Sequence, residues 1–162
     1  MDEGNRGSGD AGRALTVFAP ASGRVIPLEE VPDPVFACAA LGGGVGIVPA
    51  CGTVASPIDG MVMLVADTGH AVLVRGASGV EVLVHCGIDT VRLGGRPFEV
   101  HVRVGDLVRR GDPLVDVDLD AIGAAGCDAT IPVIITNQAG RPSLTVLRDA
   151  QAAAGDPLIE LR

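Results

Sequence analysis

The sequence predicts an all-β protein, an antiparallel β-sandwich or barrel with a few short helical turns. From Leu15 onward, short runs rich in Val and Ile alternate with turns made of Gly, Pro and Asp, and apolar residues at helical spacing are scarce. The 162 residues are 48% apolar with a mean hydropathy of +0.43, which suits one domain with a full core. Because Trp and Tyr are absent and Phe occurs three times, the core must consist of Val, Ile, Leu and Ala.

The elements follow from this alternation. Residues 1–13 are polar and glycine-rich and are expected to form a flexible tail, while residues 14–162 are expected to form a single domain. The apolar runs predict strands at 15–18, 23–27, 45–48, 52–55, 60–65, 70–75, 80–85, 113–117, 131–135 and 157–161. Short helical turns are expected at 34–40, 119–124 and 147–152.

A near-repeat links two of the expected turns. Residues 19–23 (APASG) resemble residues 56–60 (SPIDG), and both are typical of a Pro–Gly turn that leads into a strand. The two units either pack as a pseudo-symmetric pair or share their turn by chance.

Charge and composition exclude several functions. The net charge of −8 argues against binding to a nucleic-acid backbone, and the twelve cationic residues are all Arg, so lysine chemistry is excluded. The sequence has no unbroken run of 18 apolar residues, so we expect no insertion into a membrane. The expected location is the cytoplasm.

The most informative segment is a predicted hairpin that carries two of the three histidines. Two β-like runs flank the loop at 76–79, which has Gly at each end. If Arg75 faces Val80, then His70 stands directly opposite His85, with Cβ atoms about 5 Å apart. A three-residue loop or a bulge would shift the register by one residue and separate the two histidines onto opposite faces.

Two neighbouring imidazoles suit metal binding, nucleophilic catalysis or charge stabilisation. A catalytic metal usually needs a third protein ligand, and the candidates Asp67, Asp89 and His101 do not have the spacing of a histidine metal motif. Neither a G-x-S-x-G elbow nor a Walker A loop is present. Covalent catalysis remains, in which one neutral histidine attacks a phosphoryl group and the other donates a hydrogen bond to the added charge.

Two polar neighbours of the histidines are further candidates. Thr68 lies two residues before His70, so its hydroxyl shares a face with that imidazole if the strand already runs there. Asp89 is interpreted either as a residue that steers a cationic partner or as a turn-capping residue.

Several of these segments together resemble the glucose-type enzyme IIA proteins of the bacterial phosphoenolpyruvate-dependent sugar phosphotransferase system. The similarity runs from about residue 14 to 162, and its matching segments are 18–23, 31–37, 55–60, 68–71, 84–91 and 105–112. The resemblance implies an antiparallel β-sandwich of the duplicated hybrid motif type. It also implies a shallow apolar depression that holds both histidines and needs no cofactor.

The resemblance implies a phosphocarrier, which is a phosphotransferase component. His85 matches the histidine that takes phosphate on Nε2 from the phosphohistidine of HPr. The family's histidine passes this phosphate to a Cys of the enzyme IIB domain of a sugar permease (IIB/IIC), and the resemblance implies a permease of the glucose, N-acetylglucosamine or β-glucoside class. His70 matches the histidine that contacts the phosphoryl group, and Thr68 matches the hydroxyl that holds His70.

The resemblance also implies a docking surface for both partners. Val35 and Phe36 match part of an exposed apolar rim, and Asp33, Asp89 and Val91 match further positions near that rim. Apolar groups bordered by acidic residues suit a transient interface with a basic partner.

Some positions depart from the family pattern. Cys86 stands where an apolar residue usually follows the active histidine, and Ala66 and Leu83 stand at positions that are often aromatic, so we expect a thinner rim. One alternative function is a regulatory protein that binds target proteins according to its phosphorylation state. A second alternative is a zinc-binding protein in which a partner's carboxylate completes a site on His70 and His85.

Overall fold

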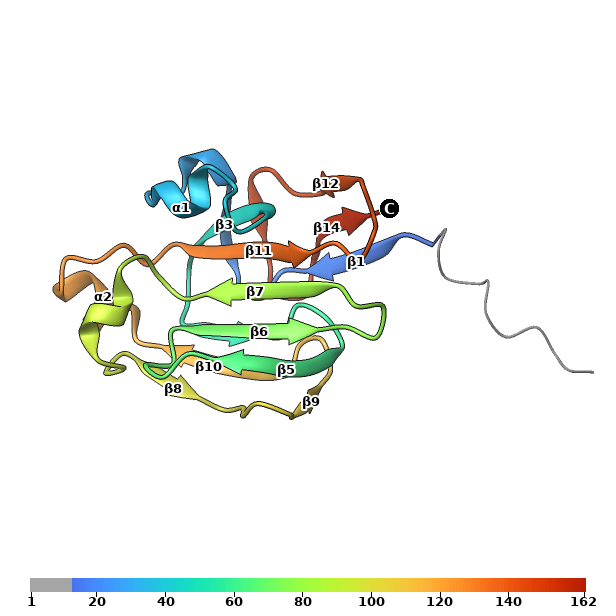
Figure 1. The fold of residues 1–162 in the computed structure, drawn as a ribbon. Helices are drawn as coiled ribbons and strands as arrows, with labels where there is room; N and C mark the ends of the chain where they lie inside the picture. The colour runs from blue at the N-terminus through green and yellow to red at the C-terminus, as the bar shows by residue number, and fades with distance from the viewer. Residues whose placement is uncertain (1–12) are drawn as a thin grey trace, which may run out of the picture.

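The structure, a computed structural model, describes residues 13–162 (Figure 1). The tail expected over residues 1–13 therefore lies outside the described residues, apart from the exposed Arg13. The strands are β1 (Leu15–Phe18), β2 (Gly23–Pro27), β3 (Gly43–Pro49), β4 (Thr53–Ala55), β5 (Gly60–Val65), β6 (Ala71–Arg75), β7 (Glu81–His85), β8 (Phe98–Val100), β9 (Leu107–Val108), β10 (Pro113–Val117), β11 (Ile131–Asn137), β12 (Leu144–Val146), β13 (Gln151–Ala152) and β14 (Pro157–Leu161). The helices are α1 (Pro34–Ala37) and α2 (Leu119–Ala124), with 3-10 turns η1 (Leu28–Glu30) and η2 (Thr90–Leu93).

The strand pairs of the described residues are antiparallel and form one large and two small sheets. The large sheet has the order β13-β2-β3-β11-β7-β6-β5-β9, and the small sheets have the orders β1-β14-β12 and β4-β10-β8. The prediction of an antiparallel all-β fold is therefore confirmed. Figure 1 shows β11, β7, β6 and β5 running side by side, with α1 near the end at which β7 finishes.

The main core lies on the inner face of the large sheet and consists of Val, Ile, Leu and Ala, with one Cys. Strand β7 illustrates the alternation, because Val82 and Val84 are fully buried while Leu83 and His85 on the other face are half-buried. A second, smaller cluster packs beneath α1 and η1 and consists of Ile26, Leu28, Val31, Phe36, Ile88 and Ile134. This cluster fixes α1 beside the end of β7.

The near-repeat is a structural duplication. The Phe18 amide donates to the Pro57 carbonyl at 2.9 Å, and the equivalent Ala55 amide donates to the Pro20 carbonyl at 2.8 Å. These reciprocal bonds join the two turns around a local pseudo-twofold axis. The packing of the two units as a pseudo-symmetric pair is therefore confirmed.

The duplication extends to the strands that follow. Strand β13 pairs with β2 as β9 pairs with β5, and β14 pairs with β1 as β10 pairs with β4. Asp156 accepts from the Ala153 amide, and Asp112 likewise accepts from the Arg109 amide, each at 2.9 Å. The same turn and strand pattern is thus used twice.

The helical turn predicted at 147–152 is wrong. The Ala150 carbonyl accepts a bond from the Val25 amide at 2.7 Å, and Gln151 and Ala152 pair with β2 as strand β13. Ala152 is buried in the core, so the sheet edge overrides the helix propensity of the alanines. Strands β8, β9 and β12 were not predicted, because each has only two or three residues and carries no periodic signal.

Within residues 13–162, no helix is long and apolar enough to cross a membrane.

Candidate active site

His85 is the last residue of β7, and the turn that follows fixes its imidazole. Its Nδ1 lies 2.7 Å from the carbonyl oxygen of Gly87. Because a carbonyl only accepts hydrogen bonds, Nδ1 carries the proton and donates it. The neutral ring then has its lone pair on Nε2, which is the arrangement that a nucleophilic nitrogen needs.

The predicted register of the histidine hairpin is wrong by one residue. Arg75 pairs with Glu81 rather than Val80, and His85 therefore faces Ala71 rather than His70. The loop spans residues 76–80 and is closed by a 2.9 Å bond from the Gly76 amide to the carbonyl of Val80. The glycines at both ends of the loop did not reveal this additional residue.

The two histidines nevertheless meet. Their ring centroids lie 5.0 Å apart with the planes at 75°. Strand β6 begins only at Ala71, and Gly69 has a φ of +75°, so His70 belongs to a turn and does not follow the alternation of the strand. A 2.6 Å bond from the Cys86 amide to the His70 carbonyl keeps the two segments together.

Thr68 contacts His70 as the sequence predicted. Its Oγ1 lies 2.5 Å from Nδ1 of the imidazole, and both residues are part-buried. When the hydroxyl donates to Nδ1, the proton of the neutral ring is on Nε2, and the ring can donate to a group bound in front of it.

Helix α1 forms one wall of the site. The Asp33 side chain caps it by accepting from the Val35 amide at 2.9 Å, and Pro34 begins it. Phe36 is only 5% exposed, and its ring centroid lies 4.9 Å from that of His85. Phe36 therefore lines the depression next to His85, but as a buried ring of the second cluster that supports the imidazole, and the expectation that it is exposed is wrong.

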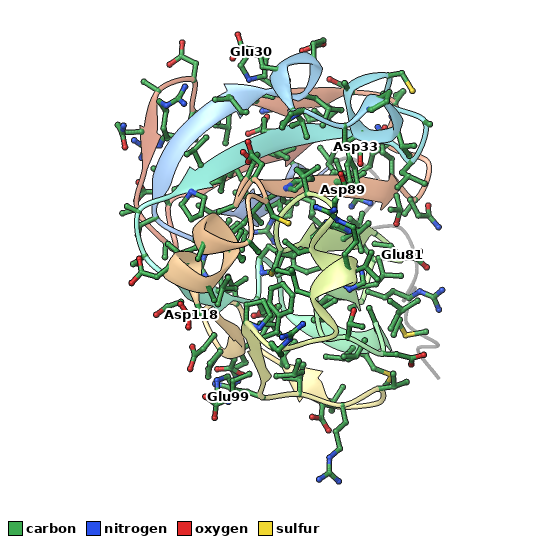
Figure 2. All side chains as sticks on the ribbon, turned by 90° about the vertical axis from the view of Figure 1, so that its left-hand side faces the viewer. Glu30, Asp33, Glu81, Asp89, Glu99 and Asp118 are labelled. Atoms are coloured by element: carbon green, nitrogen blue, oxygen red, sulfur yellow. The ribbon has the colours of Figure 1, made fainter. Side chains whose placement is uncertain are left out.

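A shallow depression of about 210 Å³ opens over His85. Val35 and Val91 border it with exposed fractions of 49% and 52%. The carboxylates of Asp33 and Asp89 also line it, and Figure 2 shows these two residues close together at this end of the molecule. Asp89 directly precedes η2 but makes no side-chain cap bond to it, so the turn-capping interpretation is wrong and its carboxylate stays exposed.

Burial keeps both imidazoles neutral. Loss of solvation lowers the pKa of His85 below its ordinary 6.5, and the bond to Gly87 and the charges of Asp33 and Asp89 oppose this only partly. Loss of solvation also lowers the pKa of His70. At neutral pH the free lone pair of His85 is therefore available for reaction.

Cys86 points away from this site. Its side chain is 1% exposed and belongs to the main core, and burial raises the pKa of the thiol to about 12. A neutral thiol in this position does not compete with His85 for a phosphoryl group. The departure at Cys86 therefore changes core packing rather than the chemistry of the depression.

A metal site at the histidine pair lacks support. In the described part of the chain, the one cluster with metal-ligand geometry is exposed and consists of Glu99 on β8, His101 just after β8 and Asp116 on β10. His101 is exposed at the surface, and its Nε2 lies 2.9 Å from a carboxylate oxygen of Asp116. None of the third ligands considered for His70 and His85 lies in such a cluster with them.

The comparisons with known proteins agree with this geometry. Residues 15–140 match the family described as phosphoenolpyruvate-dependent sugar phosphotransferase system, EIIA 1. A glucose-specific EIIA component of Oceanobacillus iheyensis is 42% identical over 89% of this chain and 87% of that protein. The glucose permease IIA of Mycoplasma capricolum has a solved structure that superposes with a TM-score of 0.88 at 36% identity, covering 93% of this chain and 97% of that chain.

Other relatives are much longer. A β-glucoside-specific EIIBCA component of Dickeya chrysanthemi is 44% identical over 92% of this chain, but the match spans only 24% of that protein. A glucose-specific EIIBCA component of Corynebacterium glutamicum is 41% identical over 93% of this chain and 22% of its own length. These relatives combine EIIA with EIIB and EIIC segments in one polypeptide.

The all-β fold, the half-buried histidine pair and these comparisons together place the chain among the phosphotransferase components that transfer phosphate through histidine. The chain belongs to the EIIA 1 family of the sugar phosphotransferase system and is a phosphotransferase component of that relay. Sequence reasoning missed two groups of the site, the Gly87 carbonyl and the side chain of Thr90, which also lines the depression. A main-chain oxygen leaves no residue-type signal, and only the permissive Gly after Cys86 hinted at an unusual backbone.

Proposed function

We propose that His85 carries the phosphoryl group and that its Nε2 accepts it from phospho-HPr. The observation that carries this proposal is the 2.7 Å bond from Nδ1 to the Gly87 carbonyl, since it leaves Nε2 as the free nucleophile. The Nε2 lone pair attacks phosphorus, the bond from phosphorus to the HPr histidine breaks, and that histidine keeps the electron pair. The proton on Nδ1 stays in place throughout.

The second step reverses the role of His85. A cysteine thiolate of an enzyme IIB domain attacks phosphorus, and the bond to Nε2 breaks with its electron pair returning to the imidazole. His70 lies beside the His85 ring and is proposed to donate from Nε2 to a phosphoryl oxygen, with Thr68 holding its Nδ1. Such a donor stabilises the charge that the phosphoryl group brings into a half-buried site.

The two carboxylates are proposed to act on both docking and reactivity. Asp33 and Asp89 line the depression with Val35 and Val91, which fits an interface with a basic partner. A phosphoryl group on His85 adds negative charge near these carboxylates, and the repulsion favours its onward transfer.

We further propose HPr as the donor, a IIB/IIC sugar permease as the acceptor, and the cytoplasm as the location. The permease belongs to the glucose, N-acetylglucosamine or β-glucoside class. The similar proteins from Oceanobacillus iheyensis and Dickeya chrysanthemi are described as glucose-specific and β-glucoside-specific, which supports this class.

A two-stage transfer assay tests this relay. The chain is labelled from radioactive phospho-HPr, purified, and mixed with an isolated enzyme IIB domain of a glucose permease. We expect label on the chain and then on the IIB cysteine, and no label on a His85→Ala variant. Normal labelling of His85→Ala would overturn the assignment of the nucleophile, and a His101→Ala variant serves as the control.

A further inference from the structure

The turn after His85 has an unusual backbone that needs support from outside its own hydrogen bonds. Gly87 has a φ of +85° and Asp89 a φ of +58°, so two of three consecutive residues are left-handed. The Ile88 amide between them donates to the Asp128 carbonyl at 2.9 Å. The direction of the Gly87 carbonyl, and with it the tautomer of His85, depends on this turn.

A buried side chain fills the inside of the turn. Thr90 is fully buried, and its Oγ1 donates to the carbonyl of Cys86 at 2.7 Å. Apart from Ser56 and Thr130, no other polar or charged residue in the described part of the chain is buried to this degree. This buried hydrogen bond links two residues that are four positions apart in the sequence, and it closes the turn at its base.

Thr90 also packs directly against Gly87. A Cβ placed on Gly87 would lie 2.4 Å from Cγ2 and 3.2 Å from Oγ1 of Thr90. The side chain of Thr90 thus occupies the space next to the glycine and limits how its peptide groups can rotate. Its hydroxyl is bound to Cys86, so it acts on the backbone and not on a bound phosphoryl group.

We propose that Thr90 is a positioning residue, which holds the Gly87 carbonyl against Nδ1 of His85 and so keeps Nε2 free for phosphoryl transfer. The inference rests on the proposed role of His85 and extends it to a residue that does not touch the phosphoryl group. Thr90 also begins η2, so the same anchor sets the place of Asp89 and Val91 at the edge of the depression.

The test separates the hydroxyl from the methyl group. Thr90→Val keeps the packing on Gly87 and removes the bond to Cys86, whereas Thr90→Ser keeps the hydroxyl. Ser56→Ala is the matched control, because it removes a buried hydroxyl that binds a carbonyl, that of Ile58, also at 2.7 Å, outside the depression. NMR of the ring nitrogens of the full chain reports the tautomer of His85, and labelling from phospho-HPr reports the rate.

In Thr90→Val we expect a measurable Nε2–H tautomer of His85 and a labelling rate lower by about fivefold, the effect of losing one buried hydrogen bond. Thr90→Ser and Ser56→Ala should keep the wild-type tautomer. An unchanged tautomer in Thr90→Val would overturn the inference, even if the rate fell. Failure of the wild-type chain to take up phosphate would instead overturn the proposed function, because the tautomer is measured without phosphate.

Discussion

The two histidines differ in the hydrogen bond that each Nδ1 makes. The Gly87 carbonyl fixes the proton of His85 on Nδ1, and the Thr68 hydroxyl is in place to fix the proton of His70 on Nε2. One ring then has a lone pair on Nε2 and the other an N–H group on Nε2, and the two ring centroids lie 5.0 Å apart. The hairpin pattern predicted the pair and the spacing to His70 predicted Thr68, but the Gly87 carbonyl emerges only from the folded backbone.

Replacing His70 separates acceptance from donation. His70→Gln should still take up one phosphate, because His85 and its bond to Gly87 are unchanged. Onward transfer to an enzyme IIB domain should slow by at least about tenfold, as expected when a donor that stabilises developing charge is replaced by a weaker one. Single-turnover transfer from the purified phosphorylated variant measures this, and a wild-type rate would rule out the role given to His70.

The lowered pKa of His85 predicts how stability depends on pH. The unfolded chain binds a proton on this histidine near pH 6.5, while the folded chain binds it only at lower pH. The neutral imidazole therefore contributes stability above pH 6.5, and this contribution is lost as the pH falls through the folded-state pKa. Urea unfolding at a series of pH values should show a smaller loss in His85→Gln than in the wild type. Identical pH profiles for the two proteins would show that the pKa of His85 is not lowered.

At the scale of elements, α1 places an exposed and a buried apolar residue next to each other. Val35 is half exposed at the edge of the depression, while Phe36 is buried against His85. The sequence predicted both as rim residues, because a four-residue helix has too little periodicity to show which side chain turns inward.

Two substitutions in α1 should therefore affect different quantities, HPr binding in one case and the free energy of unfolding in the other. Val35→Ser should weaken binding of HPr by about fivefold, through loss of apolar area at the interface, and leave unfolding unchanged. Phe36→Ala should lower the free energy of unfolding by about 3 kcal/mol, as cavity-forming Phe substitutions do. Calorimetric titration with HPr and urea unfolding measure the two quantities. A destabilised Val35→Ser with normal HPr binding would contradict this division.

The strands themselves were largely predictable, and their register was not. Alternating apolar residues located β1, β2, β5, β10 and β14 with their observed bounds. The hairpin of β6 and β7 depends on the hydrogen bonding of its loop, which Gly76 and Gly79 permit in more than one form. The histidine pair was predicted correctly although the register that led to it was wrong, because His70 lies outside the strand.

At the scale of the whole molecule, the duplicated turns and strands join the two ends of the described chain into one fold. Strand β1 pairs with β14, so Leu15 lies opposite Leu161 and the two ends of the described chain close the same small sheet. These pairings support residues 14–162 as a single domain, which we propose as its extent.

Removal of residues 1–13 should leave this domain intact. The shortened chain should melt within about 2 °C of the full chain, because the pairing of β1 with β14 is retained; a shift of that size corresponds to no more than about 1 kcal/mol in a domain of this length. Scanning calorimetry at matched concentration measures this. A drop of about 10 °C would show that residues before Ala14 belong to the fold.

The central claim is that His85 accepts phosphate from HPr, and one measurement tests it directly. The purified chain is incubated with enzyme I, HPr and phosphoenolpyruvate, and its intact mass is determined under alkaline conditions, which preserve phosphohistidine. We predict a gain of one phosphate that maps to His85 and is lost in acid. No gain with a competent HPr, or a phosphate that maps to another residue, would contradict the account.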